Sequence, residues 1–195
     1  MKSMSSQRGV GLIEVMVALL LLASAILGYS ALQGQAIKAT NEALERSQSL
    51  VMMRNIAEKI HANPSAITTY ATKLNETGEG SAPSNRCGLD GQAVTTLCTP
   101  VQLAEAESYK LKRELQQYEF QIQMHPCPNT GGSSADVEKN IMYSYCLISA
   151  WGKTTATIGT NEDTDCLTKR VIEDETVKET GGNYHYKATC MMMEI

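Results

Sequence analysis

The sequence lacks the short motifs by which many enzymes and cofactor sites are recognised. It contains no H-E-x-x-H, no G-x-S-x-G, no phosphate-binding P-loop and no C-x-x-C pair. Its three histidines, His61, His125 and His185, lie far apart along the chain. We interpret each as a surface or packing residue, because none belongs to a catalytic or metal-binding motif. The sequence therefore predicts neither an enzyme nor a cofactor.

Basic residues are scarce in the larger, C-terminal part of the chain. After His61 there are 11 lysines and arginines against 17 aspartates and glutamates, a formal charge of −6. A surface that binds duplex DNA needs clustered basic residues to neutralise phosphates. The composition therefore gives no support for contact with nucleic acid.

Charge is absent from one long stretch near the N-terminus. No charged residue lies between Val15 and Ile37, and residues 15–32 are mainly Val, Leu, Ile, Met and Ala. This run is long enough to cross a bilayer as a helix. Burying its Val, Leu and Ile side chains in lipid is worth about −3 to −5 kcal/mol. Glu14 lies at the end of the run, so it costs less than the roughly 2.5 to 3.5 kcal/mol of a carboxylate at the bilayer centre. We expect the segment to insert into a membrane.

Cysteine is absent from residues 1–32, which include the apolar run. All six cysteines come later: Cys87, Cys98, Cys127, Cys146, Cys166 and Cys190. No two have the C-x₂-C spacing of a zinc site, and an even number in one exported segment predicts three disulfides, with the pairing left open. We expect Cys87–Cys98 to close the Gly- and Ser-rich loop that begins at Asn75. Lys2 and Arg8 precede the apolar run, so the positive-inside rule places the cysteine-bearing part in the periplasm.

Glycine and proline are absent between Gln35 and Asn63. Apolar residues recur there at helical spacing, as in Ile37, Leu44 and Val51, with charged residues off the apolar stripe. This pattern predicts that the helix continues to about His61, where it packs on a globular domain, and that Pro64 ends it.

The rest of the chain predicts a helix followed by strands. Thr99, Pro100 and Gln102 form a capping-box sequence that begins a helix ending at about Gln117. Alternating or branched runs then predict antiparallel strands at residues 118–124, 141–151 and 184–195, with a minor strand near 171–177. The expected fold class is α+β: a long N-terminal helix on an antiparallel sheet, with a second short helix and disulfides.

The N-terminal residues carry a family resemblance. Arg8 and Gly9 end a short polar leader, the apolar run follows at once, and Glu14 is the fifth residue after the glycine. This arrangement resembles the type III signal of type IV pilins and pseudopilins. The resemblance implies that prepilin peptidase cuts after Gly9 and that Val10, where the family usually has phenylalanine, becomes the N-methylated N-terminus. It also implies an assembly role for Glu14, since a carboxylate in lipid is costly unless paired, here with the α-amino group of a neighbouring subunit.

Two further segments narrow the resemblance. The sequence MRNIAEKIHANP at residues 53–64, and CTPVQLA at residues 98–104, resemble the PilV group of minor pilins, in which a strand also tends to end in Trp, as Trp151 does. The resemblance implies a low-abundance subunit that primes pilus assembly near the fibre tip and supports twitching motility, adhesion or DNA uptake. Its implied partners are other minor pilins, the major pilin, prepilin peptidase, the inner-membrane assembly platform and lipid.

The same resemblance implies four segments and a location. Residues 1–9 are the prepilin leader, 10–34 the transmembrane and assembly half of the helix, 35–63 its amphipathic half, and 64–195 the periplasmic pilin domain. The protein is expected to be a single-pass inner-membrane protein that then joins the pilus fibre. Two alternatives are a minor pseudopilin of a type II secretion system and, from a different class, a membrane-anchored periplasmic enzyme or binding protein.

Two weaker patterns suggest metal ions. Asn161, Asp163 and Asp165 have the spacing that begins an EF-hand loop, but Cys166 stands where that loop needs glycine and Ile172 where it needs glutamate. A looser calcium site is left open.

The run Met191-Met192-Met193 offers thioethers that copper can bind. In a strand its side chains would alternate between two faces, so core packing is the favoured interpretation.

Overall fold

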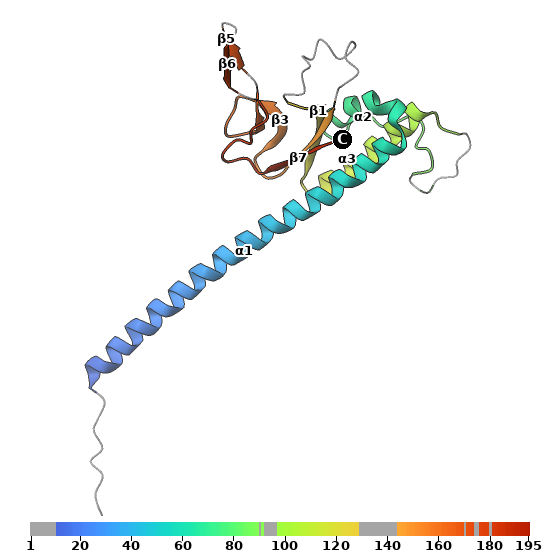
Figure 1. The fold of residues 1–195 in the computed structure, drawn as a ribbon. Coiled ribbons are helices and arrows are strands. Elements are labelled where there is room, and N and C mark those ends of the chain that lie inside the picture. Colours follow the sequence, from blue (N-terminus) through green and yellow to red (C-terminus); the bar gives the residue numbers. More distant parts are fainter. Residues whose placement is uncertain are drawn as a thin grey trace, which may run out of the picture. The chain divides into compact units, whose positions relative to one another are not determined.

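The computed structural model describes residues 11–89, 91, 97–128, 144–169, 171–173, 176–179 and 181–195 (Figure 1). The chain divides into two compact units, residues 1–44 and 45–195. Helix α1 (Leu12–Ala62) contributes residues to both units. Its bounds confirm the predicted long N-terminal helix.

In the first unit, α1 carries its apolar residues exposed. Every residue from Gly11 to Leu44 is exposed. The two serine hydroxyls of the apolar part bond back to the helix itself: Ser24 donates to the carbonyl of Leu21, and Ser30 to that of Ile26. A hydroxyl satisfied in this way costs little in lipid, because it leaves no polar group without a partner.

In the second unit, the last turns of α1 bury a stripe of side chains. They are Ser49, Met53, Ile56, Ala57 and Ile60. Because these residues are three or four apart, they lie on one helical face, and this face packs into the main hydrophobic core.

The chain turns after α1 through a short 3₁₀ helix, η1 (Pro64–Ala66), into helix α2 (Ile67–Leu74). Our sequence analysis did not predict α2. Proline is tolerated in a first helical turn, and Tyr70 and Leu74, four residues apart, both become fully buried. Burial of that short apolar face, which local pattern alone did not reveal, stabilises the helix.

Helix α3 (Pro100–Gln117) begins with the predicted capping box. The Gln102 amide donates to Thr99 Oγ1 at 3.3 Å, and the Thr99 amide donates to Gln102 Oε1 at 3.0 Å. Two N-terminal donors are thereby satisfied. The predicted second helix is confirmed, including its end at Gln117.

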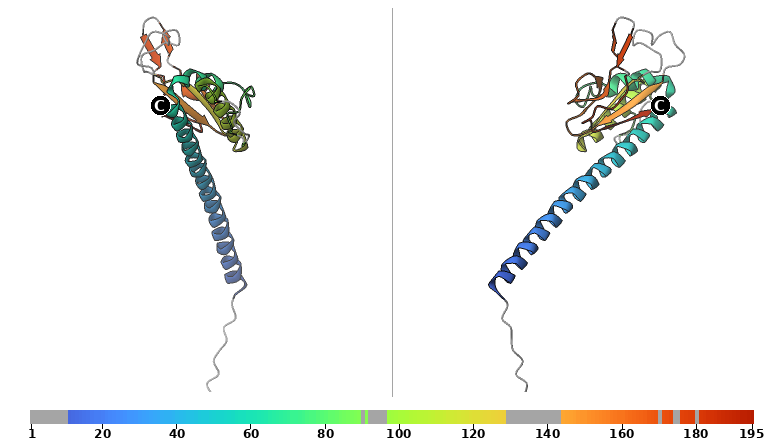
Figure 2. Two further views of the ribbon diagram at one scale, coloured as in Figure 1. Left: turned by 90° about the vertical axis from the view of Figure 1, so that its right-hand side faces the viewer. Right: turned by 60° about the vertical axis from the view of Figure 1, so that its left-hand side comes forward.

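The main sheet is antiparallel with strand order β1-β2-β7. Its strands are β1 (Gln121–Pro126), β2 (Tyr145–Ala150) and β7 (Cys190–Glu194). Figure 2 shows the orange strands of the globular unit against its green helices. The first strand begins later than predicted, because the backbone of Glu119 has a φ of +57° and turns the chain out of α3. The last strand is also shorter than predicted, because the segment before it forms a turn that the Ala188 amide closes on the carbonyl of His185. For the middle strand, predicted residues 141–143 lie outside the described residues.

Four further strands form two small sheets. Strands β3 (Thr155–Gly159) and β4 (Asp165–Thr168) pair in parallel, and β5 (Val171–Glu173) and β6 (Thr176–Glu179) pair antiparallel. The sequence analysis expected only one minor strand near residues 171–177. The segment does form strand structure, but as a hairpin of two strands. The parallel pair of β3 and β4, in the Thr-rich stretch before it, was not predicted.

Two cores lie on the two faces of the main sheet. The larger contains Leu147 of β2 with residues of α1, α2, α3 and β1, and the smaller contains Ile148 and Ala150 of β2 with residues of β3 and β4. Met191 and Met193 pack against the larger core and Met192 against the smaller one. The expected alternation of the three methionines is therefore observed, and all three serve packing. The predicted α+β fold is confirmed.

Candidate functional site

The residues expected to carry processing and assembly lie at the start of α1. Gly9 and Val10 lie outside the described residues. Gly11 comes just before the first residue of α1, and its carbonyl accepts from the amide of Glu14 at 2.9 Å. Glu14 therefore lies in the first helical turn, where its negative charge is favoured by the helix dipole.

The helix that follows Glu14 is suited to a membrane. Within the part of the chain that the structure describes, α1 is the one helix long and apolar enough to span a bilayer. Leu20, Leu27 and Leu32 each expose 70% or more of their surface. A continuous apolar surface of this size normally contacts lipid or other proteins.

Three disulfides link segments within the second unit. Cys87–Cys98 links the loop after α2 to the start of α3, Cys127–Cys146 joins the ends of β1 and β2, and Cys166–Cys190 joins β4 to β7. The Cα atoms of the three pairs are 5.9, 4.9 and 5.9 Å apart, all within the usual range. Because every cysteine is paired, none is available as a metal-binding thiolate.

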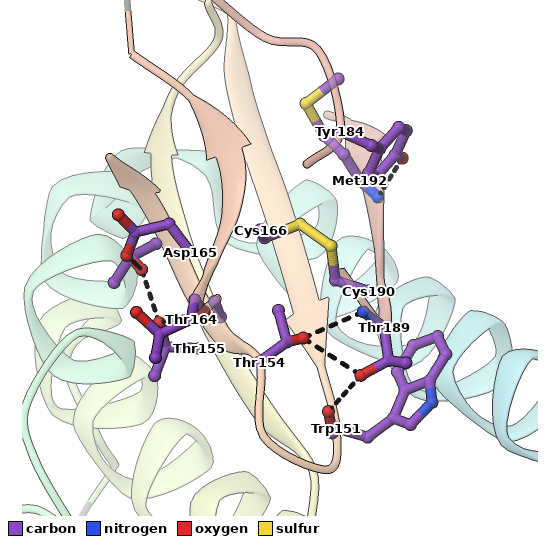
Figure 3. Close-up of a disulfide and its surroundings, with 12 residues drawn as sticks. Trp151, Thr154, Thr155, Thr164, Asp165, Cys166, Tyr184, Thr189, Cys190 and Met192 are labelled. Carbon is purple, nitrogen blue, oxygen red and sulfur yellow. Dashed lines mark hydrogen bonds between the residues drawn. A yellow bond between two sulfur atoms is a disulfide. The ribbon is translucent and has the colours of Figure 1, made fainter. Parts of the chain in front are cut away.

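The Cys166–Cys190 disulfide lies beside a network of hydroxyl groups (Figure 3). The Thr189 amide donates to Thr154 Oγ1 at 2.9 Å, and the Thr189 hydroxyl donates to the carbonyl of Trp151 at 2.6 Å. These bonds hold the turn after β2 against the entry to β7. The disulfide and the hydroxyls together fix the smaller core to the main sheet.

A second polar cluster joins the end of α1 to α2 and α3. Glu107 of α3 accepts from the Lys59 ammonium of α1 at 3.0 Å and from the Tyr70 hydroxyl of α2. Burial, aided by the Glu107 carboxylate, raises the pKa of Tyr70 above its usual value. The Asn63 side-chain amide adds a bond to the carbonyl of Pro100 at 2.8 Å. The cluster holds the end of α1 on the globular unit.

Among the residues whose burial the structure describes, Lys112 of α3 is the one buried lysine or arginine, with 7% of its surface exposed. Its ammonium donates to the carbonyls of Lys73 and Glu76, just where α2 ends. Cations are favoured there because the last carbonyls of a helix lack amide partners. Burial lowers the pKa of Lys112. The sequence analysis missed this residue, since nothing in the local pattern separates it from the neighbouring exposed lysines.

The three histidines contact different groups. His61 is exposed in the last turn of α1. His125 Nε2 lies 3.1 Å from the carbonyl of Ala156, and His185 Nε2 lies 3.3 Å from that of Gly159. Burial lowers the pKa of His125, although its contact with Ala156 acts in the opposite direction. His125 and His185 therefore have packing and hydrogen-bonding roles.

In the acidic turn at residues 161–165, the side-chain oxygens accept hydrogen bonds from donors of the protein itself. Asp165 accepts from the Asn161 amide at 2.9 Å and from the Thr157 hydroxyl at 2.8 Å. Asn161 Oδ1 accepts from the Asp163 amide, and Asp163 pairs with Lys187 at 3.0 Å. Among the described residues no three histidine, cysteine or acidic side chains are placed to hold a metal ion. The open calcium hypothesis gains no support from this geometry.

Comparison with known families gives two adjacent matches. Residues 4–29 match the prokaryotic N-terminal methylation motif, and residues 31–109 match the family described as type IV pilin Tt1218. No significant match was found among curated proteins or among solved structures. The first match covers the residues just before α1 and the apolar part of α1, and the second covers the rest of α1, α2 and part of α3. These matches show that residues 4–109 are similar to type IV pilins in two consecutive segments.

Proposed function

We propose that this chain is a minor type IV pilin that prepilin peptidase cleaves after Gly9, and that it helps to prime pilus assembly. The observation that carries the proposal is the position of Glu14. It is the fifth residue after Gly9 and lies in the first turn of an exposed apolar helix. The match of residues 4–29 to the methylation motif supports the same assignment.

The physical role of Glu14 follows from its position at the head of a membrane helix. After cleavage, Val10 carries a new α-amino group at nearly the same depth as the carboxylate. A carboxylate on one subunit and an ammonium on its neighbour attract strongly in lipid and satisfy each other. The pair would therefore fix the register in which subunits enter the fibre, while the apolar side chains of α1 pack on neighbouring helices.

N-terminal sequencing of the mature protein tests the processing step. We expect a start at N-methylated Val10 after co-expression with prepilin peptidase. The variant Gly9→Val should stay uncut, because the peptidase is expected to need a residue without a side chain at this position. Gly11→Ala is the matched control and should be cut normally, since a Cβ at Gly11 meets only Ile13 Cγ2 at an ordinary 3.9 Å. A mature protein that retains its first nine residues would contradict the proposal.

Fibre incorporation tests the assembly step. Glu14→Ala should insert into the membrane as the unmodified protein does, but should be largely lost from sheared fibres. Glu45→Ala, on the exposed part of the same helix, serves as the control and should be incorporated normally.

Deletion of the gene distinguishes a pilin from a pseudopilin. Loss of fibres or of twitching with normal protein secretion supports the pilin, whereas loss of secretion with normal fibres assigns the chain to a type II secretion system. A membrane-anchored binding protein or enzyme would affect neither.

A further inference from the structure

The outer edge of β1 offers backbone groups for pairing. In an antiparallel pair, residues that bond to the partner strand alternate with residues whose amide and carbonyl point away. The Cys127 amide donates to the carbonyl of Ser144, and β1 continues in register from Pro126↔Tyr145 to Gln121↔Ala150. The backbone groups of Met124 and Ile122 therefore face away from β2. The sheet order places β1 at an edge, so these groups face no further strand of the main sheet.

At Met124 a side chain already takes the place of a neighbouring strand. The Asn75 amide donates to the carbonyl of Met124 at 2.8 Å, and Asn75 Oδ1 accepts from the Met124 amide at 2.8 Å. One side-chain amide thus makes both bonds that a peptide unit of an added strand would make. This edge is therefore competent for strand pairing, with one position already filled.

At Ile122, two residues earlier, the backbone amide and carbonyl also point away from β2. Among the described residues, no side chain binds them as Asn75 binds Met124. The space beside Ile122 is a cavity of about 560 Å³ between the end of α2, the end of α3 and the start of β1. Leu74, Leu115 and Phe120 give it an apolar floor. Its volume falls within the roughly 300 to 1,000 Å³ of known ligand pockets.

Among the charged side chains that line this cavity, Glu119 is the one for which the described residues provide no ion pair or hydrogen bond, so its carboxylate is free to pair with a cation of an occupant. Two carboxylates, Glu76 and Glu119, line it together with the ammonium of Lys112. That ammonium is engaged by the carbonyls of Lys73 and Glu76, and the Glu76 carboxylate accepts from Lys73 at 2.9 Å. The Glu119 carboxylate is exposed.

Glu119 also occupies an unusual backbone conformation. Its φ of +57° lies in the left-handed region, which favours glycine and costs other residues about 1 kcal/mol. Here this conformation ends α3, since the Phe120 amide donates to the carbonyl of Leu115 and the Glu119 amide donates to that of Gln116.

We propose that the β1 edge at Ile122 docks an extended, positively charged segment of a partner protein. The segment pairs through its backbone with the amide and carbonyl of Ile122, and it places a lysine or arginine beside Glu119. This is strand addition, in which main-chain bonds supply affinity and the neighbouring side chains supply specificity. The site lies wholly in the globular unit, so it does not depend on the processing of the N-terminal helix.

Binding of a designed peptide to the full chain in zwitterionic nanodiscs tests the proposal. The probe is an acetylated, amidated Lys-Val-Lys-Val-Lys peptide with a fluorescent label, read by anisotropy. We expect binding, together with slower amide exchange at Ile122. The same peptide with alternate N-methylated amides should bind at least about tenfold more weakly, because it cannot make the backbone bonds. Equal binding of the N-methylated peptide, or no binding of the first peptide, would overturn the proposal.

Two matched variants test the charge. Glu119→Gln should weaken binding about threefold, as expected for one exposed ion pair. Glu114→Gln removes a carboxylate near the same end of α3 that does not line the cavity, and it should leave binding unchanged. Equal weakening by both variants would indicate attraction to the acidic surface as a whole and would contradict docking at this edge.

Discussion

Lys59 of α1 and Glu107 of α3 form an ion pair of 3.0 Å across 48 residues of sequence. The same carboxylate accepts from Tyr70 of α2, so one side chain joins three helices. The Glu107 carboxylate is only 12% exposed, so water screens it weakly. The Tyr70 side chain that binds this carboxylate belongs to the main hydrophobic core, as does the buried apolar stripe of α1.

Replacing Glu107 by glutamine should therefore destabilise the globular unit. We expect a loss of about 1 to 3 kcal/mol, because two donors lose a charged acceptor at a partly buried site. Trp151, the only tryptophan, is buried and reports unfolding by its fluorescence in denaturant titrations of the full chain in detergent. Glu114→Gln, at an exposed pair of 4.0 Å with Lys110, should change stability by less than about 0.5 kcal/mol. Equal effects of the two variants would contradict the role of Glu107.

His125 should make the globular unit sensitive to mild acid. Burial lowers its pKa in the folded state, so the unfolded state binds a proton first as the pH falls. Its contribution to stability is full above the unfolded value of about 6.5 and is lost as the pH falls through that value toward the lower folded pKa. His125→Gln should therefore flatten the fall in unfolding free energy between about pH 7 and pH 5. His61→Gln, at an exposed position, is the control and should leave the slope unchanged.

Gly159 should not tolerate a side chain. A Cβ at this position would lie 2.0 Å from Asp165 Oδ2, so the carboxylate would have to leave the Thr157 hydroxyl and the Asn161 amide. We expect Gly159→Ala to destabilise the chain by about 1 to 3 kcal/mol. In an Asp165→Ala background the same change should cost much less, because the clashing atoms are gone. A double-mutant cycle measured by denaturation checks this coupling, and additive costs would show that Asp165 is not the obstacle.

Removing the Cys127–Cys146 disulfide should weaken the main sheet. Replacing both cysteines by alanine should cost about 2 to 4 kcal/mol of unfolding free energy. Because the disulfide joins the ends of β1 and β2, amide exchange should quicken at Gln123 and Ile148, a residue pair that bonds across the two strands. The matched Cys87→Ala, Cys98→Ala variant should affect those two amides less, since that disulfide closes a loop outside the sheet. If both variants changed exchange equally, the disulfide would not act locally.

Much of the fold could be predicted because it depends on local pattern. The apolar run and the glycine-free stretch after it predicted α1 to within a residue of its end at Ala62, and Thr99 with Gln102 predicted the start of α3. Capping and helical periodicity act over three or four residues, so the sequence displays them directly. Strand ends were predicted less well, because a turn residue such as Glu119 sets where pairing begins.

The candidate sites divide in the same way. The positions of Gly9, Val10 and Glu14 relative to the apolar run can be read along the chain, and their roles in processing and assembly stay predictions. Asn75 looked like the start of a loop, yet its side chain fills a position at the edge of β1, 49 residues away. Lys112 looked like any surface lysine, yet it is buried against the end of α2.

Local pattern was enough to establish a membrane-length helix with an acidic residue at its head, a capped second helix and a later segment that contains all the cysteines. Folding in three dimensions decided the pairing of the cysteines, the parallel pair of β3 and β4, and the open pairing position at Ile122 on the β1 edge. The physical reason is that periodicity and capping act between near neighbours in sequence. Disulfides, strand partners and buried ion pairs form between distant residues, whose proximity depends on how the whole core packs.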